Sequence, residues 1–348
     1  MKRYLTIILI IVCANAIGQN DYLKIEKVSK GEDFSFPVIH ADVELVQEKI
    51  NILLQLSELD LIKGKEEKNI FEIVRSDDVS IHAGKVYMGF HILNNTRKNL
   101  AIKFVQGSCG MTCANWVCYY NFNPQNGDRY ALQDFFTDSN FTAFKNYITP
   151  IRQQKIKKQI DELKKTEETG FEEIKYLEEY LYGYIEEDDL NDFYFTSDSL
   201  FFDNYNLLYK NDKYLYDFNH LTGIPIKDIQ YLLNDFGKSA LLTGENLKNF
   251  QSMAEPQLYE GTIGNKSEFY LLFRNEYENN FDGIYAYKKY GKAIDLEGKF
   301  KDSQYSFIEY NDNYEEIADI TFEKDKTTLT GYWQNRKGNK LTFTAKRK

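Results

Sequence analysis

The sequence predicts an α+β fold, with an N-terminal antiparallel sheet and packed helices followed by a small all-β meander. Three observations support this prediction. Aromatic residues make up 16% of the 348 residues, against only 5 Pro, and aromatic side chains favour strands. Apolar residues recur at helical spacing in the first part of the chain, whereas roughly the last 90 residues alternate with period two. The length indicates about two domains.

The N-terminus has the pattern of a secretory signal peptide. Two basic residues precede an apolar run from Tyr4 to Val12 and a small-residue stretch at 14–16. The run is too short for a transmembrane helix, which needs about 20 apolar residues. We therefore expect residues 1–19 to be removed and the protein to be exported, periplasmic or extracellular, with no integral membrane span. Lipidation at Cys13 is the alternative, although bulky Val12 precedes it.

The net charge is strongly negative. The chain has 43 basic and 53 acidic residues, for a formal charge of −10. Removal of residues 1–19 takes away two basic residues and no acidic one, which leaves a charge of −12. Such a chain would be repelled by nucleic acid and by anionic membranes. The charge would attract a cationic partner, or it serves solubility alone.

The N-terminal region predicts five strands and one helix. Strands are expected at residues 22–28, 34–39, 81–93, 100–105 and 116–122. Between the second and third strands, apolar residues from Val43 to Leu56 recur at three- and four-residue spacing and predict an amphipathic helix. The polar segment 94–99 has the composition of a hairpin loop, and Asn123–Asp128 is a turn containing an Asn-Gly pair.

The middle of the chain predicts three helices and a hairpin. Residues 138–140 offer capping side chains for a helix through Ile148. From Pro150 to Glu187 the chain is highly charged but keeps apolar residues at helical spacing, which indicates two solvated helices packed by one face. Segments 193–195 and 200–202 form a hairpin, and 227–233 closes the region as a short helix or strand.

A composition shift between residues 239 and 257 predicts a domain boundary, with one domain at 20–240 and an all-β domain at 257–348. Beyond the boundary, a glycine precedes an apolar residue by two positions four times. These glycines are Gly261, Gly283, Gly298 and Gly331. The repeat suggests that each glycine lets a neighbouring aromatic ring lie over the backbone. About eight strands, in a barrel or a sandwich, fit this pattern best.

The cysteines predict one disulfide. Cys109 and Cys113 flank a short loop containing Gly110, and in an oxidising compartment a bridge is the first expectation. Cys118 follows on a strand that carries Trp116 and Tyr120 on the same face, so we expect it to be a reduced, buried, small apolar residue. Pairing of Cys118 with Cys109 or Cys113 is the alternative.

No motif predicts catalysis or metal binding. The histidines are His40, His82, His91 and His220. None shares a motif with a Cys or Ser, and a separation of nine places His82 and His91 on opposite faces of one strand. The acidic run Glu186–Asp189, with Asp192 nearby, lacks the alternating pattern of a calcium loop. We expect no catalytic residue, no cofactor and no bound metal, and we predict that the protein is not an enzyme.

Several segments carry a family resemblance. They are 34–39 with 48–51, 119–122 with 126–127 and 132–136, 192–202, and 223–226. Together they resemble the outer domain of lysozyme-sensing anti-sigma factors and the extracytoplasmic module found beside certain peptidoglycan deacetylases, over residues 22–235. In that family the loop before Tyr119 is usually rich in Gly with an Ala-His pair, where this chain has Ser108–Cys113. The resemblance implies an extracytoplasmic binding module, and the last 90 or so residues resemble small β domains of exported bacterial proteins.

The sequence therefore predicts an exported, non-enzymatic binding module of the bacterial cell envelope. Its expected partner is a cationic protein such as a lysozyme-like enzyme, or peptidoglycan. Trp116 and Tyr119, near the 108–113 loop, would anchor the partner if they face outward. One alternative is a structural or assembly factor that associates through the β domain. The other is a cell-wall hydrolase whose site leaves no local signature.

Overall fold

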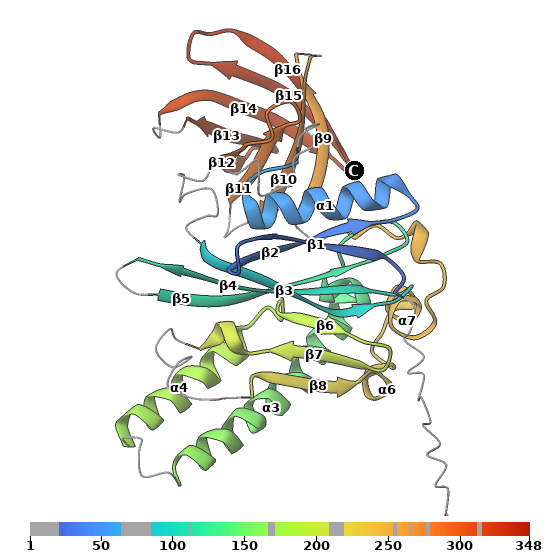
Figure 1. The fold of residues 1–348 in the computed structure, drawn as a ribbon, viewed down its shortest axis with the longest axis vertical. Helices are drawn as coiled ribbons and strands as arrows, with labels where there is room; N and C mark the ends of the chain where they lie inside the picture. The colour runs from blue at the N-terminus through green and yellow to red at the C-terminus, as the bar shows by residue number, and fades with distance from the viewer. Residues whose placement is uncertain are drawn as a thin grey trace, which may run out of the picture.

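The fold is a stack of layers. The computed structural model describes residues 21–63, 85–110, 113–165, 171–208, 219–252, 256–264, 266–275, 279–311 and 315–348. From one end to the other run a β-barrel, one long helix, a five-stranded sheet, and a three-stranded sheet with further helices (Figure 1). The predicted signal peptide, Cys13 and His82 lie outside the described residues.

The central layer is a five-stranded sheet. Its strands, in spatial order, are β1 (Lys24–Lys30), β2 (Phe34–His40), β3 (Lys85–Asn95), β4 (Leu100–Cys109) and β5 (Cys113–Phe122). Three of the four pairings are antiparallel, but β2 and β3 run parallel, with Phe34 opposite Met88. The sheet is therefore mixed, where the sequence predicted an antiparallel one. The difference arises because a helix intervenes between β2 and β3, and such a crossover returns the chain in the same direction.

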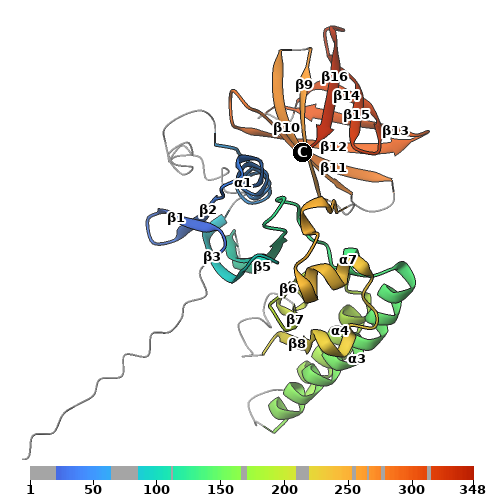
Figure 2. The same ribbon diagram turned by 90° about the vertical axis from the view of Figure 1, so that its right-hand side faces the viewer.

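Helix α1 (Glu44–Leu59) is the crossover, and it lies between the sheet and the barrel (Figures 1 and 2). The helix predicted from Val43 to Leu56 is confirmed. Its buried residues are Val46, Lys49, Ile50, Ile52, Leu53, Leu54, Gln55, Leu56, Glu58 and Leu59. One hydrophobic cluster joins α1 to Phe36 and Phe104 of the sheet and to Leu272 and Ile284 of the barrel. The helix thus packs against both modules.

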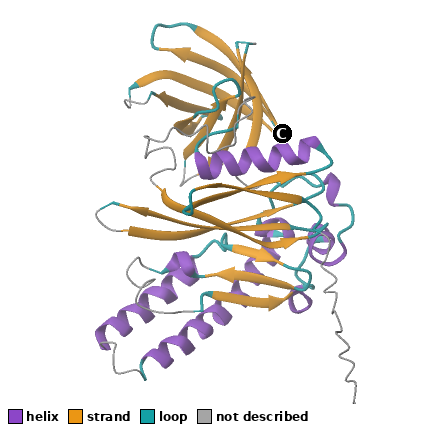
Figure 3. Ribbon diagram, in the orientation of Figure 1, coloured by secondary structure: helices purple, strands orange, loops and turns teal. Residues whose placement is uncertain are grey.

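The third layer combines a small sheet with helices. It contains β6 (Phe193–Phe195), β7 (Ser199–Asp203), β8 (Leu221–Pro225), α3 (Asp138–Leu163), α4 (Phe171–Glu187), α6 (Ile226–Ile229) and α7 (Asp235–Lys238), together with one-turn helices at Leu132–Phe135, Tyr205–Leu207, Ser239–Thr243 and Leu247–Asn249. Figure 3 shows α3 and α4 side by side at the end opposite the barrel. The predicted 193–202 hairpin is confirmed as β6 and β7, whereas β8 was not predicted from the sequence.

Helix α3 corrects two predictions. It runs without interruption through Pro150, where the sequence predicted separate helices. Proline removes one backbone donor, but Phe144 and Ile148 before it, and Ile156 and Ile160 after it, are all buried and hold the helix in place. The capping side chain is Thr137, which accepts from the Asn140 backbone N–H at 3.3 Å, so the cap precedes residues 138–140. The two predicted helices that pack by one face are the second half of α3 and α4.

The C-terminal layer is a closed, antiparallel, eight-stranded barrel. Its strands are β9 (Gln257–Ile263), β10 (Ser267–Asn275), β11 (Asn280–Tyr287), β12 (Ala293–Lys301), β13 (Gln304–Tyr310), β14 (Glu316–Asp325), β15 (Thr328–Asn335) and β16 (Lys340–Arg347), and β16 pairs with β9 to close it. Of the two predicted architectures, the barrel is the one observed. The glycine prediction is confirmed at two of the four positions, because a Cβ on Gly261 would lie 2.7 Å from the Phe269 ring and one on Gly298 would lie 2.5 Å from the Phe307 ring. A Cβ on Gly283 would meet Leu271 first, at 3.4 Å, and one on Gly331 would meet the Thr321 carbonyl, so no ring requires these two glycines.

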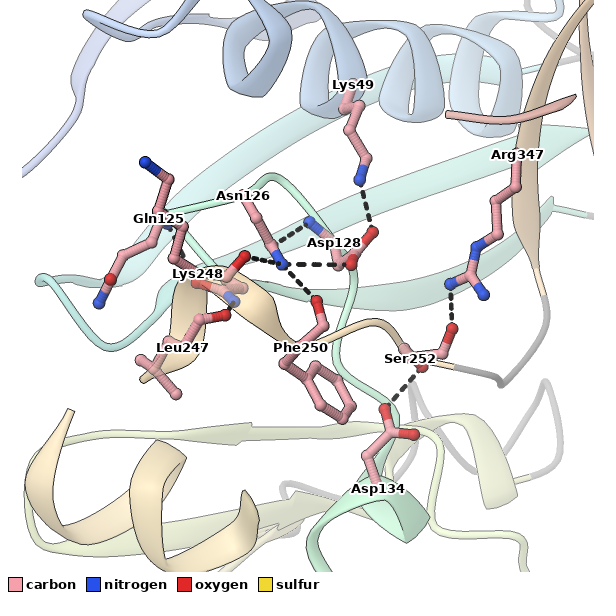
Figure 4. A network of polar contacts seen from close by, with 11 residues as sticks. Lys49, Gln125, Asn126, Asp128, Asp134, Leu247, Lys248, Phe250, Ser252 and Arg347 are labelled. Atoms are coloured by element: carbon pink, nitrogen blue, oxygen red, sulfur yellow. Dashed lines mark hydrogen bonds and ion pairs between the residues drawn. The ribbon is translucent and has the colours of Figure 1, made fainter. Parts of the chain in front are cut away.

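The segment before the barrel is bound to the first module by polar contacts (Figure 4). Asn126, in the predicted Asn-Gly turn, donates from Nδ2 to the Phe250 carbonyl at 2.5 Å. Ser252 donates from Oγ to Asp134 at 2.7 Å and accepts at its carbonyl from the guanidinium of Arg347, the last residue of β16. Residues 247–252 are therefore held between the turn, Asp134 and the barrel.

A second set of contacts joins the barrel to α1. Tyr270 of β10 donates to Glu48, and the Lys348 ammonium lies 2.8 Å from Glu48 and 2.7 Å from Glu260. Beyond α1, the chain pairs with the segment just before β12, because the Ile62 N–H donates to the Gly291 carbonyl at 2.7 Å. The barrel is thus joined to α1 along the helix and at its C-terminal end.

The separated barrel is predicted to fold but to associate with itself. Its interior has its own packed cluster, while removal of α1 would expose a set of outward apolar side chains, namely Leu258, Tyr270, Leu272, Ile284 and Ala286. Exposed apolar patches promote association. Fragment 256–348 should therefore show β-type circular dichroism and a mass above that of a monomer in light scattering, and Leu272→Glu should lower that mass. An unfolded fragment would contradict an independent barrel core.

Asp60 is predicted to make the joint between α1 and the barrel less stable as the pH rises. Burial and the neighbouring Asp295 raise its pKa from 3.8 to about 6. Because the folded pKa lies above the unfolded one, the stabilising contribution is fully present below pH 3.8 and is lost as the pH rises through 6. Asp60→Asn should stabilise the protein by about 2 kcal/mol at pH 8 and by little at pH 4. Urea unfolding of both proteins at the two pH values checks this, and an equal effect at both would contradict it.

Candidate functional site

A cleft of about 280 Å³ lies where the five-stranded sheet meets the three-stranded sheet. Its lining residues are Leu93, Lys103, Tyr119, Tyr194, Asp203, Asn219, His220 and Leu221. They come from β3, β4, β5, β6 and β7, from the first residue of β8 and from the two residues before it. We call this site the Asp203 cleft, because Asp203 is its central charged group.

Strand alternation explains why these side chains meet. On β4, Ile102 and Phe104 are buried in the cluster that contains α1, so Lys103 between them points to the other face. The same alternation on β5 places Tyr120 with α1 and Tyr119 in the cleft. On β7, Phe202 is buried against α3, which turns Asp203 the opposite way.

Asparagine side chains join the two sheets beside the cleft. Asn121 donates from Nδ2 to the Phe193 carbonyl at 2.8 Å, and Asn99 donates to the Phe195 carbonyl at 3.0 Å. Asn206 both accepts from the Val117 N–H at 3.0 Å and donates to the Val117 carbonyl at 2.6 Å. These side-chain amides replace the backbone ladder that two strands of one sheet would share, and they leave a space between the layers.

Asp203 is ionised and well supplied with donors. Its Oδ2 lies 3.0 Å from the Lys103 ammonium and accepts from the Tyr119 hydroxyl, while its Oδ1 accepts from the Tyr205 N–H at 2.9 Å. Burial opposes ionisation, but Lys103 and the hydrogen bonds outweigh it and lower the pKa of Asp203 below its ordinary value. Burial and the Asp203 charge raise the pKa of Tyr119, so its phenol stays protonated.

Tyr119 begins a row of parallel rings, which we call the aromatic row: Tyr119, Tyr194 and Phe201. The first two ring centroids are 5.9 Å apart and the next two 4.7 Å apart, with interplanar angles of 5° and 11°. Phe201 lies over Gly223 of β8, where a Cβ would come within 2.7 Å of its ring. At the opposite end, the Lys103 ammonium lies 5.2 Å from the Tyr119 centroid. The row thus runs from a glycine to a cation.

Charged groups of both signs surround the cleft. Arg152 of α3 is fully buried and lies 2.6 Å from Asp188. The backbone carbonyl of Asp192 accepts from the Asp203 N–H. Burial, with Asp203 and Asp188 adding to it, raises the pKa of Asp192 to about 6. Lys155 of α3 is a third cation, because its ammonium donates to the Asn219 side chain at 3.1 Å and to the Leu221 carbonyl, both in the cleft lining. Three carboxylates and three cations therefore lie in this region.

Of the two predicted anchors, Tyr119 lies in the cleft and Trp116 lies outside it. Tyr119 lines the cleft but is only 4% exposed, so it does not face outward as an anchor would need to. Trp116 is half-buried on the same strand and does not line the cleft. Lys103, Tyr194 and Asp203 were not predicted from the sequence as site residues. The sequence pattern around these residues is weak evidence for a site. A polar residue between apolar ones on a strand shows that it lies on the opposite face of the sheet, but not which part of the protein covers that face.

The structure contains the predicted bridge between Cys109 and Cys113, with α-carbons 4.0 Å apart. Cys118 is a free, half-buried thiol whose pKa burial raises, so the alternative pairing is not observed. His40 lies 3.0 Å from Glu26, and His220 lines the cleft with its ring 5.1 Å from that of Tyr205. Within the described ranges, no group of three His, Cys, Asp or Glu residues could hold a metal ion.

No protein-family model matches the chain, and no curated protein matches it in sequence. Among solved structures, the chain is similar to the crystal structure of a member of the DUF3298 family from Bacteroides fragilis. The two share 12% sequence identity with a TM-score of 0.42, over 65% of this chain and 99% of the other.

Proposed function

We propose that the chain is an exported, non-enzymatic binding module of the bacterial cell envelope, and that its ligand is a cationic protein, with a lysozyme-like enzyme as the candidate. The observation that carries the proposal is the Asp203 cleft. There a carboxylate and a tyrosine ring already hold an ammonium group, that of Lys103. A site that accommodates one cation within the protein is chemically suited to a basic side chain from outside.

The charge of the whole chain supports the same partner. A formal charge of −10 before removal of the signal peptide would speed the encounter with a basic protein. The family resemblance of residues 22–235 points to a lysozyme-like partner independently of charge. No helix in the described part of the chain is long and apolar enough to cross a membrane.

The state of the cleft residues supports binding without catalysis. Asp203 already accepts from three donors, which makes it a weak base. Tyr119 holds its proton because burial and Asp203 raise its pKa. Asp192 has a pKa of about 6, in the range of a general acid, but its side chain accepts from Asn206 at 2.7 Å and does not line the cleft.

Calorimetry is predicted to detect binding of a lysozyme-type enzyme by the protein without residues 1–19. Tyr194→Ala should raise the dissociation constant about tenfold, because the Tyr194 ring lines the cleft and aromatic anchors contribute most of the binding energy of such interfaces. The matched control is Tyr290→Ala, which removes a tyrosine that is 69% exposed on the turn between β11 and β12, and it should leave binding unchanged.

Two further titrations make this test specific. The same enzyme with its lysines succinylated should not bind, and added salt should slow association by screening charges beyond about 8 Å at physiological ionic strength. No saturable heat with any basic protein at low salt would overturn the proposal and favour a structural role. Heat only with soluble peptidoglycan fragments would show that the ligand is cell-wall material.

A further inference from the structure

We propose that Lys103 occupies, in the free protein, the position that an arginine side chain of the partner takes on binding. The cleft would then contain its own competitor, and binding would exchange an internal ammonium for an external guanidinium. The inference rests on the proposed function only for the partner's being a protein, and its test includes a small cation that requires no partner.

The position held by Lys103 has the two components of a cation site. Its ammonium lies 3.0 Å from Asp203 Oδ2 and 5.2 Å from the centroid of the Tyr119 ring. A carboxylate and an aromatic face together bind ammonium and guanidinium groups. The Lys103 side chain is 25% exposed and lines the cleft. A lysine has a flexible four-carbon stem, so Lys103 can leave toward solvent without moving β4.

The other components of the site do not depend on Lys103. Tyr119 is held by stacking on Tyr194 and by its hydroxyl on Asp203. Asp203 is held through Oδ1 by the Tyr205 N–H, and its own N–H donates to the Asp192 carbonyl at 2.8 Å. Departure of Lys103 would therefore leave a preorganised site, which lowers the cost of binding the next cation.

Charge determines the class of group that can replace Lys103. With Lys103 in place, the buried Asp203 carboxylate has an ammonium group 3.0 Å from its Oδ2. A neutral ligand that displaced the ammonium would leave the Asp203 carboxylate buried without a counter-ion, which is strongly unfavourable. The replacing group must therefore be a cation.

The lone pairs of Asp203 favour arginine over lysine. Each carboxylate oxygen has about two lone-pair sites. With Lys103 gone, Oδ1 keeps one donor, from Tyr205, and Oδ2 keeps one, from Tyr119. One site on each oxygen is then open, which is the arrangement that a guanidinium binds with two parallel hydrogen bonds. A partner lysine would only reproduce the contacts of Lys103, whereas an arginine adds a hydrogen bond and stacks on Tyr119.

Two substitutions at position 103 should act in opposite directions. Lys103→Met keeps a linear side chain but removes the competing charge. It should strengthen binding of a lysozyme-type enzyme about tenfold, because the cation position beside Asp203 is then open in every molecule. Lys103→Arg strengthens the competitor and should weaken that binding. The control is Lys299→Met, which removes the same charge at an exposed position on β12 and accounts for general attraction.

A small probe tests the site without a partner. Propylguanidinium should bind the Lys103→Met protein and shift the Tyr119 and Asp203 resonances in an NMR titration. It should bind this variant at least about tenfold more tightly than propylammonium does. Wild-type protein should bind it about tenfold more weakly than Lys103→Met does. Failure of propylguanidinium to bind Lys103→Met would overturn the inference.

The outcomes separate the inference from the proposed function. Enzyme binding that Tyr194→Ala weakens, but that Lys103→Met and Lys299→Met change equally, would overturn the inference and leave the function standing. Binding of propylguanidinium without binding of any basic protein would overturn the function and support the cation site. If Lys103→Met does not fold, Lys103→Arg decides, because binding of the enzyme equal to or tighter than that of wild type would overturn the inference.

Discussion

Burial of α1 on two sides is the constraint on which the rest of the structure depends. A helix at the surface of a globular protein has one apolar face, but this helix has a sheet on one side and a barrel on the other. Its carboxylates mark the two sides. Glu48 accepts from Tyr270 of the barrel, while Glu58 accepts from Tyr120 at 2.5 Å and from Gln106 at 2.6 Å in the sheet. The buried Lys85 ammonium lies 3.1 Å from Glu58 and balances its charge.

The position of α1 also determines the second face of the sheet. Because α1 covers one face, the apolar residues of β4 and β5 point to it, and the residues between them point away. That second face meets a small sheet which is held by asparagine side chains. The Asp203 cleft is therefore the consequence of a sheet with one face covered by a helix and the other covered only in part. Lys103 and Tyr119 carry the polar chemistry of that partly covered face.

Local sequence patterns predicted the local structure. The period-two alternation and the four glycines predicted an all-β domain of about eight strands, with a barrel and a sandwich both open. The spacing of Val46, Ile50 and Leu53 predicted α1, and a short loop between cysteines predicted the disulfide. Pro150 predicted a break that the burial of α3 on both sides of it overrides. The parallel pairing of β2 with β3 depends on where α1 packs, which lies beyond the range of a local pattern.

The candidate site was less predictable for a physical reason. Lys103 and Asp203 are 100 residues apart in the sequence, and neither belongs to a motif, so only the packing of two sheets brings them together. Tyr119 was identified from its place near the disulfide loop. How far each face of β5 is exposed depends on α1, which covers one face, and on the three-stranded sheet, which covers the other. The contacts of Asn99, Asn121 and Asn206 across the two sheets were not predictable either, because in the sequence these are ordinary loop or strand residues.

The two tryptophans of the chain allow the most direct test of the role of α1. Trp116 lies in the sheet and Trp333 in the barrel, so Trp333→Phe and Trp116→Phe each leave one fluorescent reporter in one module. If α1 makes the two modules one cooperative unit, the fluorescence transition in urea should coincide with the circular-dichroism transition in both variants. The account would be contradicted if the fluorescence transition of Trp333 in the barrel and that of Trp116 in the sheet occurred at clearly different urea concentrations, and if the circular-dichroism transition had two steps.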